Sequence, residues 1–337
     1  MPMSRMRMAA KGTPTTRDLG LSIRMLVTLL LVSGVYAGTA IVLLRIFVPL
    51  FVNSGAPVLL PLIVIAGIAV IMIGTDPLRA VHAEPIGPDE HPELHRILDR
   101  LCGLADVPKP ELALVHTDAA NSFATGFTPG TSTIAVTQGL LDQLEPEELE
   151  AVLAHELSHV VNRDGAVMSF AAIPATASAA VSHRFKARWF IFWIGVWWLV
   201  VLLKLYAAFT STLMLILSRY REYAADRGAA VLTGAPEQLM SALQKISGPA
   251  IPSTDLRALD GVGCFCIVDS SGRPTHPPVD ARLAKLADLA RGMGHQPPPT
   301  FNATAKPVDS GLAALTPYAM LAVLVAAAWI YIRIRMG

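Results

Sequence analysis

Two histidines and a glutamate lie close together in the stretch EELEAVLAHELSHVVNRD, where residues 155–159 read HELSH. Four residues of α-helix advance by about 400° and about 6 Å, so His155 and His159 project from one helix face, one turn apart. At this spacing two neutral imidazoles can bind one metal ion. Glu156 lies about 100° around the helix from His155, so it overhangs the open metal position and can take a proton from water there. The pattern predicts a zinc site of the kind that hydrolyses peptide bonds.

The alternative is an ordinary helix that happens to display these three side chains on its solvent face. The flanking runs AVLA and VV are apolar, and unpaired polar groups in apolar surroundings cost free energy unless they are ligated or hydrogen-bonded. This favours the metal site. Catalytic zinc sites typically have three protein ligands, so one more must come from elsewhere in the chain.

A second pair of candidate ligands occurs in SRYREYAADRGAA, residues 218–230, where Glu222 and Asp226 repeat the i, i+4 spacing. One carboxylate could complete the zinc shell while the other orients a ligand, because ligating histidines commonly donate their second N–H to a carboxylate. The alternative is a solvated, charged helix end with Arg219, Arg221 and Arg227 as partners.

The elements around HELSH are those of a soluble α+β domain. Pro146 suits the first position of a helix, and the glutamates within 147–150 complement the positive end of its dipole, so HELSH lies well inside a helix. Upstream, ELALVH and TSTIAVTQG predict two short strands separated by a loop. Residues 84–107 predict a polar entry and an amphipathic helix.

Composition places this domain in a membrane protein. The 337 residues are 53% hydrophobic and 16% charged, which is outside the range of ordinary soluble chains. A formal net charge of +1 without a basic stripe among aromatics argues against a nucleic-acid partner. Cys102, Cys264 and Cys266 are too few for a disulfide framework, and the C-x-C pair is interpreted as small residues on a strand rather than a metal site.

Hydrophobic segments divide the chain. Residues 25–52 and 56–74 are each long enough for a membrane crossing, which needs about 20 residues, as is 189–217. Residues 165–181 either span or form a buried or surface helix. We expect a cytoplasmic segment at 1–24, a transmembrane hairpin at 25–74, a catalytic domain in two parts at 75–164 and 218–295 around two membrane segments at 165–217, a linker at 296–311, and a C-terminal hydrophobic segment at 312–337.

The distribution of basic residues sets the orientation. Several precede the hairpin and none lies in its connection NSGA, which places the N-terminus and the catalytic domain in the cytoplasm. If Glu222 meets the two histidines, 165–181 and 189–217 must both span or neither. Arg333 and Arg335 would keep the C-terminal end cytoplasmic, whereas simple alternation of the spans would place it outside.

Five motifs occur in order between about Glu84 and Leu289. They are NSFATG at 121–126, TIAVT followed by GLL, LEPEELEAVLAHELSH with NRD after it, SRYREYAAD, and THPP at 275–278 ahead of an Arg-containing helix. Together they resemble the HtpX-like membrane zinc metalloproteases, relatives of the CAAX prenyl proteases. The C-terminal hydrophobic segment departs from that family, whose members usually have two spans before the domain and two within it.

The resemblance implies a fold and a metal centre. The fold would be a mostly α membrane protein, with transmembrane helices and a cytoplasmic α+β zincin-type metalloprotease domain that has a small sheet and the HExxH helix. One zinc ion would be held by His155, His159 and Glu222. Glu156 would be the general base, and Asp226 would support a zinc ligand from behind.

The resemblance also implies residues that contact substrate or support the site. Asn121 would lie along the substrate-binding edge. His276 matches the family's downstream histidine and has either a supporting role in the site or a turn role before Pro277. The strand at 133–137 would be the sheet edge to which an extended peptide adds as another strand.

These features predict a zinc endopeptidase that is multi-pass in the inner (plasma) membrane, with its site facing the cytoplasm. Its expected partners are the lipid bilayer and polypeptide substrates, and the resemblance suggests damaged or misassembled membrane proteins. A prenyl-protein-type processing protease would share the site, but there are too few spans for its membrane chamber. A non-catalytic zinc-domain membrane sensor would not need Glu156, and a metal transporter would usually hold its ligands near the membrane midplane.

Overall fold

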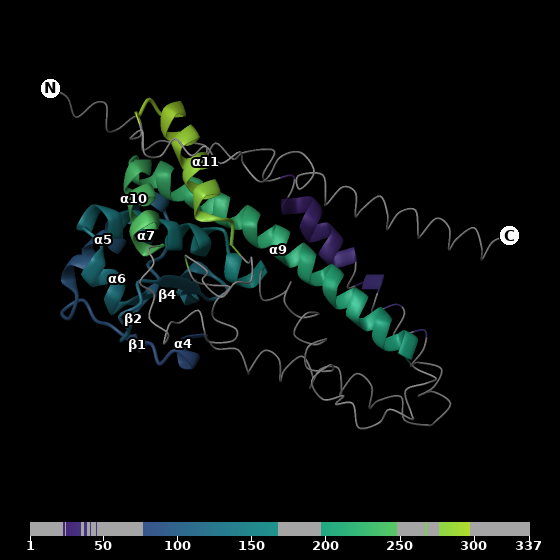
Figure 1. The fold of residues 1–337 in the computed structure, drawn as a ribbon. Helices are drawn as coiled ribbons and strands as arrows, with labels where there is room; N and C mark the ends of the chain where they lie inside the picture. Colours follow the sequence, from purple (N-terminus) through teal and green to yellow (C-terminus); the bar gives the residue numbers. More distant parts are fainter. Residues whose placement is uncertain are drawn as a thin grey trace. The chain divides into compact units, whose positions relative to one another are not determined.

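The computed structural model describes residues 77–167, 197–247, Ile267 and 276–296, together with helical stretches between 23 and 45 (Figure 1). Residues 1–22, 46–76, 168–196 and 297–337 lie outside the described residues, as do Cys264 and Cys266. Within the described part of the chain, no helix is both long and apolar enough to cross a membrane. The predicted membrane segments and domain boundaries therefore stay predictions.

The described residues form two compact units. One combines 77–167 with 218–247, Ile267 and 276–296, and it holds every predicted site residue. The other holds 197–217 and the stretches between 23 and 45. Helix α9, Trp197–Thr233, contributes to both units.

A four-stranded sheet lies in the first unit in the order β1-β2-β4-β3. The strands are β1 Glu84–Pro85, β2 Glu111–Val115, β3 Ser122–Thr125 and β4 Thr133–Thr137. β2 and β4 run parallel, while β1 pairs with β2, and β3 with β4, in antiparallel fashion. The two strands predicted from ELALVH and TSTIAVTQG are confirmed.

The prediction that 133–137 is the edge strand is wrong. β4 pairs with β2 on one side and with β3 on the other, so its backbone hydrogen-bonding groups are already used. Among the described residues the edge of this sheet is β3, which the sequence analysis placed in a loop, and its Ser122 carbonyl accepts from the Ile267 N–H at 3.1 Å. Its four residues SFAT are too short to show an alternating pattern, and the strand forms because it pairs with β4.

Both faces of the sheet are buried, because successive side chains of a strand point to opposite faces. Leu112, Leu114, Ile134 and Val136 face the main core, which α5 and α7 also build. On the other face, Ala113, Val115, Phe123 and Ala135 pack with Val81 in a second, smaller cluster. The sheet is therefore packed on both faces, and α7, which carries the HELSH residues, lies against it.

Helices pack on the sheet and against each other (Figure 1). They are α4 Pro77–Ala80, α5 Pro92–Ala105, α6 Gln138–Gln143, α7 Pro146–Val161, α10 Pro236–Ile246 and α11 Val279–Gly292, with a short 3₁₀ turn at Pro129–Thr131. α7 packs on β3 and β4 and also contacts α5 and α10, and α11 packs against α10.

Helix α7 begins where the sequence predicts. Pro146 occupies the first turn, where a missing N–H costs nothing. The Glu145 side chain accepts from the backbone N–H of Glu148, and the Glu148 side chain accepts from that of Glu145, which is a capping box. HELSH therefore lies in the last turns of a helix that is fixed at its start and buried along its length.

Candidate metal centre

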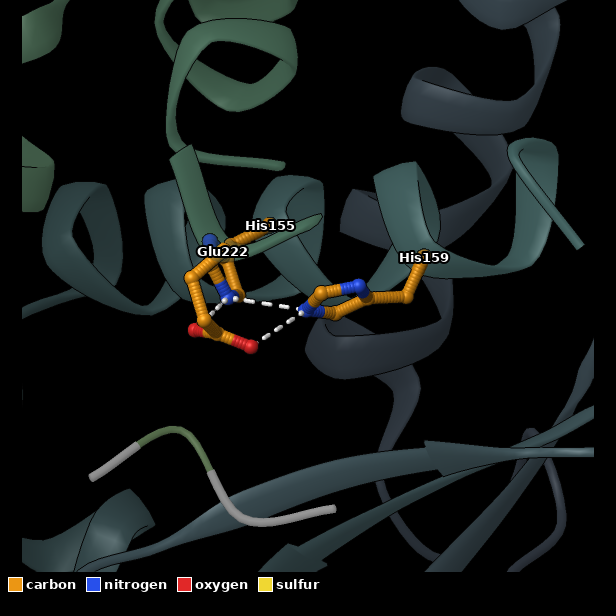
Figure 2. Close-up of side chains that lie close together, drawn as sticks. All are labelled: His155, His159 and Glu222. Carbon is orange, nitrogen blue, oxygen red and sulfur yellow. Dashed lines mark hydrogen bonds and ion pairs between the residues drawn. The ribbon is translucent and has the colours of Figure 1, made fainter. Parts of the chain in front are cut away.

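Two helices bring together three possible metal ligands (Figure 2). His155 and His159 project from α7, and Glu222 comes from α9. The Nε2 atoms of the histidines are 3.2 Å apart, and the Glu222 carboxylate oxygens lie 3.6 Å from that of His155 and 3.5 Å from that of His159. All these ligand atoms lie within 4.8 Å of one another.

The centre is buried, which excludes both solvent-face alternatives. His155 is 0% exposed and Glu156 1%, so HELSH is not ordinary helix surface. Glu222 and Asp226 are 4% and 3% exposed, so they do not form a solvated helix end. Neither group of residues therefore lies on a solvent-exposed helix face, as those two alternatives required.

Each imidazole turns its second nitrogen toward an aspartate. Nδ1 of His155 lies 3.1 Å from Oδ1 of Asp226, and Nδ1 of His159 lies 2.6 Å from Oδ2 of Asp164. An ionised carboxylate can only accept, so Nδ1 faces it with its proton, and in the neutral imidazole that binds a metal Nε2 keeps its lone pair. Both lone pairs are thus available on the side where Glu222 lies.

An arginine stands behind each aspartate. Arg282 of α11 donates from Nε to Oδ2 of Asp226 at 2.8 Å and from Nη2 to Oδ1 at 2.5 Å, and its Nη1 donates to the Ile267 carbonyl at 2.6 Å. Nε of Arg221 lies 3.0 Å from Oδ1 of Asp164. Both arginines are buried. Each metal-facing imidazole is therefore backed by an aspartate–arginine pair.

These contacts set the charge states. Burial alone would raise the pKa of Asp226 and of Asp164, but the adjacent guanidinium groups of Arg282 and Arg221 hold each pKa below its ordinary value. Burial lowers the pKa of His155, yet the Asp226 and Glu222 carboxylates outweigh it and raise that pKa to about 9. The pKa of Glu222 stays well below its usual value, because the neighbouring histidines and Arg282 outweigh its burial.

His276 is also part of the centre. It is buried, and its Nδ1 lies 3.3 Å from Oε1 of Glu222. It directly precedes Pro277, but its side chain meets the candidate ligand instead of solvent. Of the two roles expected from the sequence, the contact with Glu222 favours the supporting one.

Glu156 faces the strand at the edge of the sheet. The Ser122 hydroxyl of β3 donates to Oε1 of Glu156 at 2.6 Å. The other oxygen, Oε2, is buried and has no hydrogen-bond partner among the residues that the structure describes. One carboxylate oxygen is thus held by the sheet while the other is free to exchange a proton.

Asn121 lies just before β3 and is fully buried. Its Oδ1 accepts from the backbone N–H groups of Ser122 and Ile267, at 2.9 Å and 3.2 Å. Its own backbone N–H donates to Oγ1 of Thr137 at 2.9 Å. Asn121 therefore anchors the beginning of the edge strand and joins it to Ile267.

A small hollow, open to solvent, lies at this edge. Its walls combine the end of β3, the turn after α7 and the candidate ligands, with the lining residues Ala124, Thr125, Gly126, Ser132, His159, Val160, Gly165, Arg221 and Glu222. Small residues, Ala124 and Gly126, line its β3 side next to His159 and Glu222.

The donor set fits a zinc ion. Ligands at 2.0–2.2 Å in a tetrahedral shell are separated by about 3.4 Å. The two Nε2 atoms are 3.2 Å apart, Oε2 of Glu222 is 3.6 Å from that of His155, and Oε1 of Glu222 is 3.5 Å from that of His159. Oε2 of Glu222 is buried and makes no hydrogen bond in the described part of the chain, and its ion pair with Nη1 of Arg282 is long, at 3.4 Å. Around it, buried carboxylates outnumber buried guanidinium groups: they are Glu156, Asp164, Glu222 and Asp226 against Arg221 and Arg282. This excess of negative charge favours a bound cation.

Some residues of this centre escaped the sequence analysis. Asp164 and Arg282 lie in the quoted motif NRD and in the Arg-containing helix after THPP, but neither was given a role. Ser122 was likewise part of a motif with no function of its own. Adjacency to a motif was the only signal, because their partners are remote in sequence.

Comparisons with known proteins agree on a family. The sequence model described as "Peptidase family M48" matches residues 88–290. "Protease HtpX homolog 2" of Methanosarcina acetivorans is 40% identical over 300 residues, which is 82% of this chain and 98% of that protein. "Protease HtpX homolog" of Moorella thermoacetica is 38% identical, over 82% and 96% of the two chains.

A further sequence relative and one solved structure are also similar to this chain. "Protease HtpX homolog 1" of Streptomyces coelicolor is 36% identical over 84% of this chain and 97% of its own length. Among solved structures, the crystal structure of S. mikatae Ste24p matches 80% of this chain and 67% of that chain, with 19% sequence identity and a TM-score of 0.43.

Proposed function

From the premise that the chain belongs to peptidase family M48 and is an HtpX-like, membrane-anchored metalloendopeptidase, we propose how its residues cut a peptide bond. His155, His159 and Glu222 hold one zinc ion. Glu156 of the HExxH motif is the general base, and Asp226 orients His155 from behind.

One observation carries this proposal: the two Nε2 atoms stand 3.2 Å apart, with one Glu222 oxygen 3.6 Å from that of His155 and the other 3.5 Å from that of His159, close to the spacing of about 3.4 Å between ligands of tetrahedral zinc. Their tautomers also suit the metal, since the aspartates take the Nδ1 protons and leave Nε2 free. Little rearrangement would be needed for binding, because both helices are fixed by the core around them.

Proton transfer falls to Glu156. A bound zinc ion would supply Lewis-acid chemistry, polarising the peptide carbonyl and making water acidic enough to attack near neutral pH. Glu156 takes the proton from the attacking water with Oε2, which has no other partner in the described residues. Ser122 holds the second oxygen in place. Glu156 then returns the proton to the leaving amine, and the C–N bond breaks.

The substrate would be an extended polypeptide lying along β3 at this hollow. Its backbone would pair with this edge strand, a common way to hold an extended peptide. Asn121 supports the edge by fixing the start of β3. His276, at 3.3 Å from Glu222, would keep that carboxylate turned toward the metal. We take misfolded or damaged membrane proteins as the substrate class.

The membrane arrangement follows from the hydrophobic segments. The protein would be multi-pass in the plasma membrane, with the metal centre on the cytoplasmic side, where the basic residues before the first span place it. A prenyl-protein-type processing role is disfavoured by the small number of spans. A non-catalytic sensor is disfavoured because Glu156 is held with one oxygen free to exchange a proton.

The test compares variants of the full chain purified in detergent. Glu156→Gln should retain zinc and lose cleavage of casein or of a membrane-protein substrate by about 100-fold to 10,000-fold. Glu222→Gln should lose both cleavage and bound zinc. Glu147→Gln is the matched control, since Glu147 lies on the same helix but is exposed. Equal cleavage by wild type and Glu156→Gln would rule out the catalytic assignment, and a Glu222→Gln protein that binds zinc normally would rule out the third ligand.

A further inference from the structure

Asp164 contacts the second histidine, His159, and the arginine that precedes the third candidate ligand, Glu222. It is 2% exposed and uses one oxygen for Nδ1 of His159, at 2.6 Å, and the other for Nε of Arg221, at 3.0 Å. Arg221 precedes Glu222 in the chain and lines the same hollow as His159 and Glu222. One buried ion pair therefore contacts the second histidine and adjoins the third ligand.

The turn that carries Asp164 is itself fixed. Arg163 has a left-handed backbone, with φ 55°, which ends α7 sharply. At Gly165 a Cβ atom would lie only 2.2 Å from the Gly126 carbonyl oxygen, just beyond the edge strand β3. The turn thus packs directly against the backbone that lines the hollow, and Asp164 has little freedom to move away from His159.

The position of the pair in the chain adds a second reason. Asp164 immediately precedes the hydrophobic segment 165–181, and Arg221 follows the segment 189–217 within one helical turn. The two residues stand where the chain leaves the catalytic unit for the predicted membrane excursion and where it returns. Their contact joins these two points of the described chain next to the metal centre.

We propose that Asp164 and Arg221 are positioning residues that fasten the two ends of this excursion together and hold His159 in its metal-binding orientation. The inference rests on the proposed zinc function. The Asp164–Arg221 pair behind His159 resembles the Asp226–Arg282 pair behind His155, with one difference. Arg282 comes from the separate helix α11, whereas Arg221 directly precedes Glu222 in the chain, so losing the Asp164–Arg221 pair would disturb His159 and Glu222 together.

The experiment separates metal binding from folding. The full chain is purified in detergent and stripped of metal, its thermal midpoint is measured, and zinc affinity is then titrated against a chromophoric chelator. The variants are Asp164→Ala, Arg221→Met and the double variant. The double variant leaves no buried unpaired charge and should unfold near the wild-type midpoint, since an apolar replacement of a buried ion pair is often neutral. Its zinc affinity should still be about 10-fold to 100-fold weaker.

A matched control is available on the same helix. Glu148 of α7 is buried and pairs with Lys245 of α10 at 2.7 Å, remote from the metal ligands. Glu148→Ala should lower the thermal midpoint and leave zinc affinity unchanged. Asp164→Ala should lower both.

The outcomes are distinct. A double variant that folds and binds zinc as tightly as wild type would overturn the positioning role. If the double variant does not fold, Arg221→Met decides, because it keeps the contact with His159: a modest loss of zinc affinity supports the proposal and an unchanged affinity overturns it. A wild-type chain that binds no zinc would instead overturn the proposed function, and this inference with it.

Discussion

Gly228 of α9 and Ser158 of α7 leave no room between them for a side chain. A Cβ atom at Gly228 would lie 2.5 Å from Oγ and 3.0 Å from Cβ of Ser158. Ser158 directly precedes His159, and Gly228 lies two residues beyond Asp226. The two helices therefore approach closely beside the metal centre, and we expect this contact to influence how far Glu222 stands from the histidines.

Substituting Gly228 by alanine should separate the helices. Because the added methyl group meets a buried side chain, we expect the free energy of unfolding to fall by about 1–3 kcal/mol and zinc affinity to weaken. Ser158→Gly in the same chain removes the clashing atoms and should restore much of the zinc affinity. Thermal unfolding and zinc titration in detergent measure both effects.

Gly103 provides the control for this substitution. It lies in α5, and a Cβ atom there would meet nothing within 4 Å. Gly103→Ala should leave zinc affinity unchanged and should stabilise slightly, because alanine is the better helix former. A Gly228→Ala protein indistinguishable from Gly103→Ala would show that the close helix contact does not set the ligand geometry.

Arg282 should be among the most sensitive positions in the catalytic unit. It is 1% exposed and its guanidinium group donates to both oxygens of Asp226 and to the Ile267 carbonyl. Arg282→Met would leave the Asp226 charge buried without its partner and should cost about 3–5 kcal/mol of unfolding free energy. Arg282→Lys keeps the charge but loses the two-pronged contact, so it should recover only part of that stability.

Denaturant unfolding of the metal-free chain tests this prediction. Arg291→Lys is the matched change, since Arg291 lies on the same helix α11 and pairs with Asp288 at an exposed site, where ion pairs contribute little. Comparable losses from Arg282→Lys and Arg291→Lys would contradict the role assigned to the buried pair.

Glu148 makes stability depend on pH. Its burial would raise the pKa, but hydrogen bonds from Lys245, Ser241 and the Glu145 backbone lower the pKa from its ordinary value of 4.5. A carboxyl group with a lowered pKa in the folded state stabilises the protein fully above its unfolded pKa and loses that contribution as pH falls through the folded pKa.

The difference in stability between wild type and Glu148→Gln should therefore be largest near neutral pH and shrink below about pH 4.5. Thermal midpoints measured across this range would check it. Glu147→Gln, at an exposed position of the same helix, is the control for the loss of one carboxylate. A Glu148→Gln difference that stays constant down to acidic pH would contradict the proposed charge dependence.

Local patterns made parts of this protein predictable. Pro146 with its neighbouring glutamates located α7, and the apolar runs ELALV and TIAVT located β2 and β4, because each signal acts within a few residues. β3 was missed because SFAT carries no periodic pattern of its own. The edge was then assigned to the wrong strand, since strand order depends on pairings that no single strand encodes.

The sequence by itself determined that His155 and His159 share one helix face with Glu156 between them, because helix geometry converts spacing directly into direction. It could not determine which of Glu222 and Asp226 would face the two Nε2 atoms, nor that Asp164, Arg221 and Arg282 would support the imidazoles from behind. Only the packing of α7, α9 and α11 decided these contacts. Long-range contacts arise where separate elements bury their faces together, and their distances follow from the whole core rather than from any one segment.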